Sequence, residues 1–405
     1  MFDKYIDVIL EIGLNLQPGE RLHIRGQVSD WKLIHRITEK AYEKGASFVS
    51  VEWEDNRVDS LALLYGEEER ACTWPEWKNV ITKELLDTNA CVLSLRSPFA
   101  NGVDEQPPIE RIMRRQRSKA AANDAFNTRV LEFDLRYCIA TAPNPAWAKK
   151  VFPTLDADEA LRKLWEAVLH CSYADLDDPV AFWRRKQKEA IRRCQWMNEQ
   201  QFDAVHFIDP HTDLTVGLPP AHVWLESGVK CSSDGVFFLP NVPSEENGSV
   251  PLRNGVDGTV RLSKPLVYQE MLIEGATLRF EHGKVTAFDA ERGREALAEI
   301  IHADENACYL GEVAIVPENS AIGETGLIYY TTLFDENTSC HIALGESFPY
   351  EVGGMAGKSR EEQIAAGINR SSIHVDMMIG TKEIKVYGLK NGKRTLLLAD
   401  GDWQI

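Results

Sequence analysis

The chain lacks the cysteine patterns and long apolar runs that mark several protein classes. Its eight cysteines are scattered and none stands in a C-x-x-C pair, so neither a zinc ribbon nor a redox dithiol is indicated. No stretch approaches the roughly 18 uncharged apolar residues of a transmembrane helix. Charged residues also interrupt the early apolar segment where a secretory signal would lie. We therefore expect a cytoplasmic protein with reduced, mostly buried thiols and no membrane partner.

Basic residues are scarce as well. The chain has 45 lysines and arginines against 62 aspartates and glutamates, a formal net charge of -17. Proteins that bind nucleic-acid phosphates carry a clustered basic excess, so we expect no nucleic-acid partner. The one basic run, residues 111–117, is interpreted as a solvated helix face.

Three common catalytic signatures are missing. The chain has no H-E-x-x-H zinc-protease helix and no G-x-S-x-G nucleophile turn. No G-x-G-x-x-G follows any of the strands expected below, which leaves a dinucleotide site without support. Function must therefore be sought in residues that are dispersed along the sequence.

Length and apolar content favour two globular domains. The chain has 405 residues, of which 44% are hydrophobic and 9% aromatic, enough for sizeable cores. The first half alternates helical stretches with apolar segments rich in β-branched residues. This order predicts βαβ crossovers and a mainly parallel sheet. The expected strands are 21–25, 47–53, 91–95 and 138–142.

The texture of the chain changes near residue 200. Two long amphipathic helices are expected at about 156–173 and 179–199, and residues 204–283 then show short strands with dense glycine and proline. A Lys390-Asn-Gly-Lys393 turn predicts a hairpin near the end. We expect an α/β domain over residues 1–200 and an α+β, β-rich, metal-binding domain over residues 201–405.

Five potential metal ligands fall in four short segments of the second domain: Glu246, Glu312, His341, His374 and Asp376. Three carboxylates and two imidazoles are too much buried charge to leave unpaired. Two divalent cations would supply four positive charges, and three carboxylates with a bridging hydroxide would return four negative ones. The composition therefore suits a two-metal hydrolase.

Each ligand has a simpler interpretation. His374 and Asp376 share one face of an expected strand, where they could bind a metal or only hydrogen-bond to each other. Glu312 interrupts an apolar strand and is the best candidate to bridge two metals, but it could also point outward. His341 could be an ordinary core histidine. As a ligand it needs an acceptor on its second ring nitrogen, which Asp335 or Glu336 could supply.

The loop before residue 247 offers two carboxylates. Glu245 and Glu246 are adjacent, and adjacent extended residues point to opposite sides, so only one should reach a metal. A surface acidic pair is the alternative.

The four ligand-bearing segments resemble the aminopeptidase T / aminopeptidase S family of thermophilic-type metalloaminopeptidases. Further segments also resemble that family, so the resemblance spans nearly the whole chain: 146–153, 212–218, 255–259 and 332–341. It implies an N-terminal α/β domain, a C-terminal domain with a dinuclear metal site, and a homodimer. Carried over by position, the resemblance assigns Glu246 in preference to Glu245, Glu312 as the bridging ligand, and His341, His374 and Asp376 as the remaining ligands.

One position departs from the family. Seven residues after His341 the family has a tyrosine, and this chain has Phe348. A tyrosine hydroxyl there could donate to the oxyanion of a tetrahedral intermediate, and losing such a donor typically costs about 100- to 1,000-fold in turnover. Tyr350, two residues on, could substitute. Otherwise the metals suffice, or the protein is a repurposed member with low activity.

The leading hypothesis from the sequence is a metal-dependent aminopeptidase acting on peptides with a free N-terminus. Two divalent ions, Zn, Co, Mn or Mg, would hold a bridging water. Glu245 or Glu336 could act as general base, since both lie close to ligands in the sequence. The rival is a mononuclear non-haem Fe(II) dioxygenase using His341, His374 and Asp376, which would leave both glutamates without a role. A metal-binding scaffold without activity is a third hypothesis.

Overall fold

The computed structural model describes residues 2–100, 107–268 and 271–405. The chain divides into two compact units. One comprises Met1–Arg184 with Gly228–Val242, and the other comprises Arg185–Ser227 with Pro243–Ile405. Each unit is described separately below.

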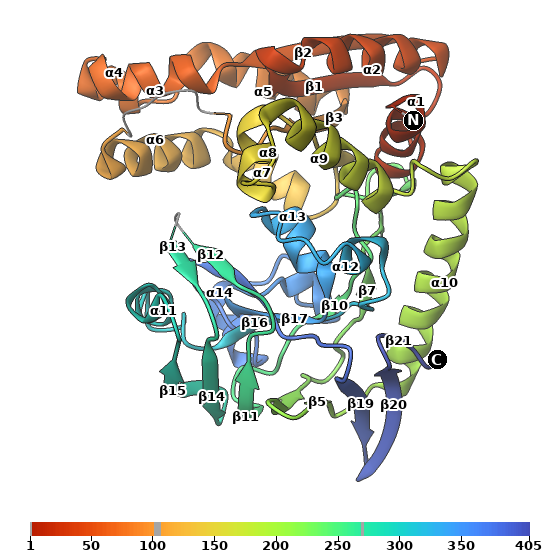
Figure 1. Cartoon of the computed structure of the whole chain (residues 1–405), viewed down its shortest axis with the longest axis vertical. Helices are drawn as coiled ribbons and strands as arrows, with labels where there is room; N and C mark the ends of the chain where they lie inside the picture. The colour runs from red at the N-terminus through yellow and green to blue at the C-terminus, as the bar shows by residue number, and fades with distance from the viewer. Residues whose placement is uncertain (1, 101–106, 269–270) are drawn as a thin grey trace. The chain divides into compact units, whose positions relative to one another are not determined.

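The first unit is built on a four-stranded parallel sheet with the strand order β2-β1-β3-β4 (Figure 1). The mainly parallel N-terminal sheet expected from the alternating pattern is thereby confirmed. Its strands are β1 (Arg21–Gln27), β2 (Phe48–Glu54), β3 (Cys91–Arg96) and β4 (Tyr137–Thr141).

Helices connect these strands, as parallel pairing requires. Helix α2 (Trp31–Glu43) joins β1 to β2, and it buries Ile34, Ile37 and Ala41 at the spacing of an amphipathic helix. The other connections use α3 (Asn56–Tyr65), α4 (Glu68–Cys72), α5 (Glu76–Thr88), α6 (Ile109–Ala122) and α7 (Asp124–Leu131).

Further helices precede and follow this sheet. The chain begins with α1 (Phe2–Asp7) and the π-helix η1 (Val8–Gly13), and the 3-10 turn η2 (Val28–Asp30) follows β1. After β4, the side chains of Asn144 and Asp156 accept backbone N–H groups and cap the two helices that follow them. These are α8 (Pro145–Val151) and α9 (Ala157–Cys171), and α10 (Pro179–Gln200) comes next.

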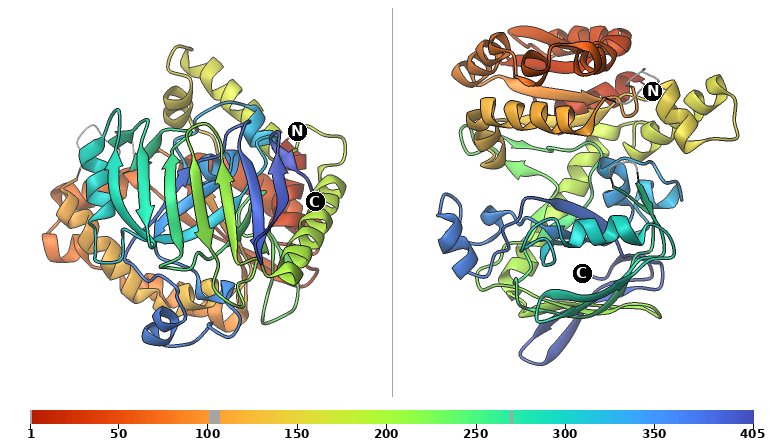
Figure 2. Two further views of the ribbon diagram at one scale, coloured as in Figure 1. Left: turned by 90° about the horizontal axis from the view of Figure 1, so that it is seen from below. Right: turned by 90° about the vertical axis from the view of Figure 1, so that its left-hand side faces the viewer.

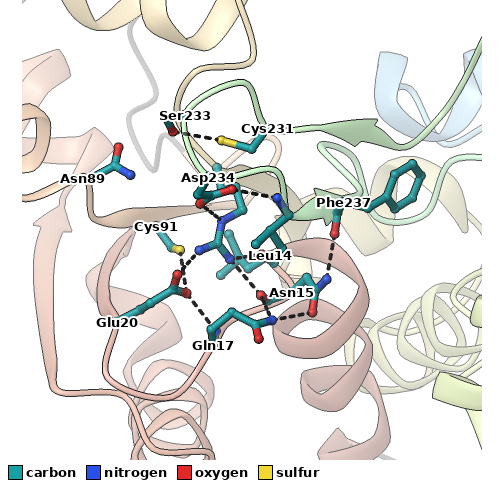
Figure 3. A network of polar contacts seen from close by, with 12 residues as sticks. Leu14, Asn15, Gln17, Glu20, Asn89, Cys91, Cys231, Ser233, Asp234 and Phe237 are labelled. Atoms are coloured by element: carbon teal, nitrogen blue, oxygen red, sulfur yellow. Dashed lines mark hydrogen bonds and ion pairs between the residues drawn. The ribbon is translucent and has the colours of Figure 1, made fainter.

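The segment Gly228–Val242 belongs to the first unit because polar contacts tie it there (Figure 3). The guanidinium of Arg136, which is buried, donates to the backbone oxygens of Leu14 and Asn15 and pairs with Glu20 and with Asp234. This segment carries β8 (Val229–Lys230) and β9 (Phe237–Phe238). The sequence predicted one boundary near residue 200. In the structure the first unit also includes Gly228–Val242, and its first segment ends at Arg184, inside the continuous helix α10.

The second unit contains an eight-stranded antiparallel sheet, whose strands lie side by side in the left view of Figure 2. The hairpin expected near the end joins its strands β19 and β20, with Asn391 and Gly392 both at positive φ, 50° and 73°. In sheet order the strands are β15 (Lys284–Asp289), β14 (Thr277–Glu281), β11 (Val256–Arg261), β6 (Asp213–Gly217), β5 (Ala204–Ile208), β19 (Lys385–Lys390), β20 (Lys393–Ala399) and β21 (Asp402–Trp403).

A five-stranded antiparallel sheet completes the second unit, in the order β18 (His374–Met378), β17 (His341–Gly345), β16 (Leu310–Ile315), β10 (Asn247–Ser249) and β7 (Leu225–Glu226). The β-rich C-terminal region expected from the sequence is confirmed. The remaining elements are β12 (Leu266–Tyr268), β13 (Met271–Ile273), α11 (Arg294–Ile301), α12 (Ala321–Glu324), α13 (Thr332–Asp335), η3 (Glu336–Thr338), η4 (Pro349–Glu351) and α14 (Arg360–Ala365).

The two large sheets of this unit share one hydrophobic core. Alternate residues of β16, β17 and β18 point into it, among them Val313, Ile342 and Val375, which meet Phe207 and Leu278 of the larger sheet. Because side chains alternate along a strand, the intervening residues of these three strands face the opposite side. Among the described residues, no helix has both the length and the apolar character needed to cross a bilayer.

Candidate metal centre

The face of the five-stranded sheet that turns away from the core carries four of the five candidate ligands. His374 and Asp376 are two residues apart on β18, so their side chains lie on the same face of the sheet. The pairing register shows which residues of the neighbouring strands lie beside them. Asp376 pairs with Ala343, and Ala343 pairs with Glu312. His341, the first residue of β17, lies two residues before Ala343 and therefore on the same face.

Small residues leave space above this face. Ala343 separates Glu312 from Asp376, and Ala314 pairs with His341 on one side and with Gly248 of β10 on the other. A Cβ atom added at Gly248 would lie 3.2 Å from the Glu312 Oε1 atom. Small side chains on the sheet thus leave room between the long polar side chains around them.

Glu312 lies at the middle of the cluster, and its two carboxylate oxygens face different histidines. Its Oε2 atom is 3.0 Å from the His374 Nε2 atom, while its Oε1 atom is 3.8 Å from the His341 Nε2 atom. Val313 lies in the core, so the side chain of Glu312 points away from the core, as its simpler interpretation expected. The outward face, however, is where the other ligands gather.

Two groups of candidate ligands share this carboxylate. One consists of Glu246, Glu312 and His341, and the other of Glu312, His374 and Asp376. His341 Nε2 lies 3.8 Å from Glu246 Oε2, and His374 Nε2 lies 3.2 Å from Asp376 Oδ1. Three carboxylates and two imidazoles arranged around one shared glutamate fit a pair of divalent cations.

One histidine has the outer contact that metal ligands usually need, and the other does not. His374 Nδ1 is 2.8 Å from the backbone oxygen of Glu346, which fixes the ring and leaves Nε2 for the cluster. His341 is 1% exposed, and its Nδ1 atom has no hydrogen-bond partner among the described residues. The expectation that Asp335 or Glu336 would supply this partner is wrong. Asp335 instead accepts the backbone N–H groups of residues 329 and 331 across a tight turn.

The charges of the metal-free cluster perturb one another strongly. Burial and the charge of Glu312 raise the pKa of Glu246. Although burial opposes it, contact with His341 and His374 holds the pKa of Glu312 well below its usual range. Burial lowers the pKa of His341, but Glu312 outweighs it and raises that pKa to about 9. Strongly perturbed pKa values that depend on one another are typical of functional sites.

Two further buried carboxylates adjoin the five. Burial, together with the charges of Glu246, Asp376 and Glu312, raises the pKa of Glu336 well above its usual value. Burial and Glu312 do the same for Glu351, which is 4% exposed and whose Oε2 atom has no partner among the described residues. The sequence analysis named Glu336 only as an alternative base and missed Glu351. Glu351 lies in the short turn η4, where no local pattern distinguishes it from a surface glutamate.

The other three residues singled out from the sequence, Glu245, Phe348 and Tyr350, belong to neither ligand group. The carboxylate of Glu245 is buried and forms an ion pair with Lys186 of α10. Phe348 occupies the departing position, and its ring centroid lies 5.1 Å from that of His374. The ring of Tyr350 stacks on that of Phe348, and their centroids lie 5.6 Å apart.

Comparisons with known proteins identify the family of the chain. The family model described as "Thermophilic metalloprotease (M29)" matches residues 1–403. Aminopeptidase 2 of Geobacillus stearothermophilus is 36% identical over 402 residues, which cover 99% of this chain and 97% of that protein. Aminopeptidase T of Thermus aquaticus is 35% identical over 404 residues, covering 100% and 98%.

A solved structure gives the same result. The wild-type AmpT of Thermus thermophilus superposes with a TM-score of 0.92 at 33% identity, covering 100% of this chain and 99% of that one. The family model and the solved structure thus both match nearly the full length of the sequence. The chain belongs to the thermophilic metalloprotease (M29) family.

Proposed function

We propose that the protein is a metal-dependent aminopeptidase that releases N-terminal residues from peptides. The observation that carries this proposal is the carboxylate of Glu312, which faces His341 with one oxygen and His374 with the other. A shared carboxylate between two histidines is the arrangement that a pair of cations needs and that a single iron does not. The relatives named aminopeptidases are similar over the whole chain, which supports the same reaction here.

Glu246, Glu312, His341, His374 and Asp376 would hold the two ions, Zn, Co, Mn or Mg. When bound, such a pair lowers the pKa of a bridging water and polarises the scissile carbonyl. The chain's own residues then have three tasks: to keep the ligands oriented, to accept and return a proton, and to recognise the free α-amino group.

For the proton we favour Glu336 over Glu245. The carboxylate of Glu245 is already paired with Lys186, whereas Glu336 faces the charges of Glu246, Glu312 and Asp376. A carboxyl group whose pKa is raised well above its usual value by such surroundings suits general acid–base work. Glu351, buried beside the cluster, is a carboxylate that remains available to bind the substrate's ammonium group.

The oxyanion would be stabilised mainly by the cations. Tyr350 stays a candidate donor, and its ring stacks on that of Phe348, which also contacts the ring of His374. The protein would therefore work without the tyrosine donor typical of its family, at a reduced rate.

A homodimer is also part of the proposal. Strand β2 lies at the edge of its sheet, and its exposed Trp53 contacts His35 of α2, which also contacts the exposed Trp31. Clustered exposed aromatic residues are typical of protein–protein contacts. A molar mass of one chain by light scattering would contradict the dimer. The cytoplasmic location stays a prediction.

The proposed activity is tested with leucine p-nitroanilide and its N-acetylated counterpart, using enzyme stripped of metal and then refilled with cobalt or zinc. We expect turnover of the free-amine substrate only, and only after metal is restored. Equal cleavage of both substrates would contradict an aminopeptidase. Failure to cleave either with metal bound would favour the dioxygenase or scaffold hypothesis.

A further inference from the structure

One face of the parallel sheet in the first unit is unusually polar. Arg25 of β1 pairs in register with Glu52 of β2 on one side and with Ser94 of β3 on the other. Sheets of this kind, covered by helices on both faces, normally present almost continuous apolar surfaces. The opposite face follows that rule, since Leu22 and Ile24 are fully buried. A polar row of Glu52, Arg25 and Ser94 across three neighbouring strands therefore calls for an explanation.

The position of this row in the topology is informative. In the order β2-β1-β3-β4, strand β2 lies on one side of β1, and β3 and β4 lie on the other side. The direction in which strands are added therefore reverses between β1 and β3. In open α/β sheets, ligands bind at such a reversal, near the carboxyl ends of the strands. Arg25 lies near the carboxyl end of β1, and Arg96 and Glu54 are the last residues of β3 and β2.

A cavity of about 360 Å³ opens over this face. Its volume falls within the range of small-molecule sites. The sheet contributes Val92, Tyr137 and Ile139, and helices α5, α6 and α7 contribute the opposite walls. Phe126 and Trp74 add aromatic surface. The cavity therefore offers an apolar lining large enough for a small organic body.

The charges around this lining do not balance. Among the described residues that line the cavity, four side chains are cationic, Arg25, Lys78, Arg96 and Lys119, and two are carboxylates, Glu52 and Glu54, an excess of two positive charges. The chain as a whole carries a formal charge of -17, so a local positive excess runs against the general trend. Field lines concentrate in such a cavity and favour negatively charged ligands.

One of the two carboxylates is already committed. Glu52 accepts from Arg25 at 3.2 Å and from Lys78 at 3.0 Å. Burial alone would raise the pKa of Glu52, but the hydrogen bonds from His23 and Lys78 and the charge of Arg25 lower it to about 2. Glu52 is therefore ionised at neutral pH, and it neutralises only one of its two main partners.

The remaining two cations are Lys119 and Arg96, and the charge of Glu54 acts on Lys119. Among the residues that the structure describes, neither the ammonium group of Lys119 nor the guanidinium of Arg96 has an ion pair or a side-chain hydrogen bond. Lys119 lies over the Trp74 ring at 5.1 Å, and Lys78 lies over the same ring at 4.9 Å. Burial lowers the pKa of Lys119, and the charges of Arg96, Arg25 and Lys78 add to this despite Glu54. A bound anion would relieve that repulsion.

We propose that this cavity is a binding site for a small organic dianion, such as a phosphate monoester or a dicarboxylate with an aromatic or aliphatic body. The anionic end would lie between Arg96 and Lys119, and the body would pack against Trp74, Phe126 and Tyr137. The cavity is lined by residues of the first unit, whereas all five candidate metal ligands belong to the second.

Calorimetric titration of the metal-loaded full chain with phenyl phosphate, phthalate and inorganic phosphate tests this site. We expect phenyl phosphate or phthalate to bind, and the preferred one identifies the anionic group. Lys119→Gln and Arg96→Gln should each weaken binding by roughly 10- to 100-fold, the usual effect of losing a charged hydrogen-bond partner. Lys83→Gln, an exposed lysine on α5 that pairs only with Asp87, is the matched control and should bind as the parent does.

The variants also separate this site from the metal centre, because phosphate groups bind divalent cations too. Binding that is unchanged in both Lys119→Gln and Arg96→Gln would place the ligand at the metals and overturn the proposal. Inorganic phosphate that binds as tightly as phenyl phosphate would overturn the role of the apolar lining. Turnover of leucine p-nitroanilide should be the same in all three variants, and their melting temperatures show whether they fold.

Discussion

At the scale of single residues, the cluster is defined by which neighbour each carboxylate faces. Glu245 and Glu246 are adjacent in sequence, yet the first pairs with Lys186 and the second lies 3.8 Å from the His341 ring. The alternation of side chains in an extended segment explains this separation. Local sequence could predict that only one of the two would reach the site. It could not predict the ion pair that holds the other, because Lys186 comes from a distant helix.

The two candidate bases can be separated by substitution. Glu336→Gln should lower turnover by about 100-fold or more with metal content unchanged, since general acid–base catalysis typically contributes 100- to 10,000-fold. Glu245→Gln should mainly cost stability, because it removes the carboxylate that pairs with the ammonium group of Lys186. Turnover numbers, metal content and melting temperatures of both variants decide this. A large loss of turnover in Glu245→Gln at normal stability would restore Glu245 as the base.

Phe348 gives a second prediction at this scale. Its ring lies against that of His374, so a hydroxyl group added by Phe348→Tyr would be close to the reacting groups. We expect turnover on leucine p-nitroanilide to rise, by up to about 100-fold if the missing donor limits the rate. Tyr350→Phe is the companion variant. An unchanged rate in Phe348→Tyr together with a loss in Tyr350→Phe would show that Tyr350 already supplies the donor.

At the scale of elements, the site depends on the register of three strands. The sequence predicted that β16 and β18 would be strands, and it placed His374 and Asp376 on one face of β18. It could not predict that Ala343 would separate Glu312 from Asp376, because pairing register is set by contacts far apart in the chain. The same holds for Glu351, which tertiary packing alone brings next to Glu312.

The small size of Ala343 can be tested. Ala343→Val adds two methyl groups between Glu312 and Asp376 while keeping every candidate ligand. We expect weaker metal binding, and a loss of stability of about 1–3 kcal/mol from overpacking. Ile342→Val, on the core face of the same strand, should cost about 0.5–1.5 kcal/mol and leave metal affinity unchanged. Equal metal affinity in the two variants would contradict the role assigned to this small residue.

At the scale of the whole molecule, fold class and family were predictable, because strand–helix alternation and the ligand segments are both local features of the sequence. The limits of the two units were harder to predict from the sequence. The segment Gly228–Val242 joins the first unit through Asp234 and the buried Arg136, a contact that no local pattern indicates. The cationic cavity of that unit was missed for the same reason, since its lining comes from strands and helices distributed over more than 100 residues.

The response of the whole chain to pH follows from the cluster. A histidine must be neutral to bind a metal, and the pKa of His341 is raised to about 9 in the metal-free protein, despite burial, by Glu312. Metal binding at neutral pH should therefore release protons, and affinity should increase as pH rises from about 6 toward 9. Cobalt titrations at pH 6, 7 and 8, with proton release measured in two buffers, test this. A pH-independent affinity would contradict it.

The central claim is that Glu312 is shared by two cations, and metal content measured beside turnover tests it most directly. We expect about two ions per chain in the parent protein. In Glu312→Gln we expect at most one tightly bound ion and a loss of turnover of at least about 100-fold. Glu299→Gln, an exposed glutamate of α11, is the control and should match the parent. Two tightly bound ions and full turnover in Glu312→Gln would contradict the account.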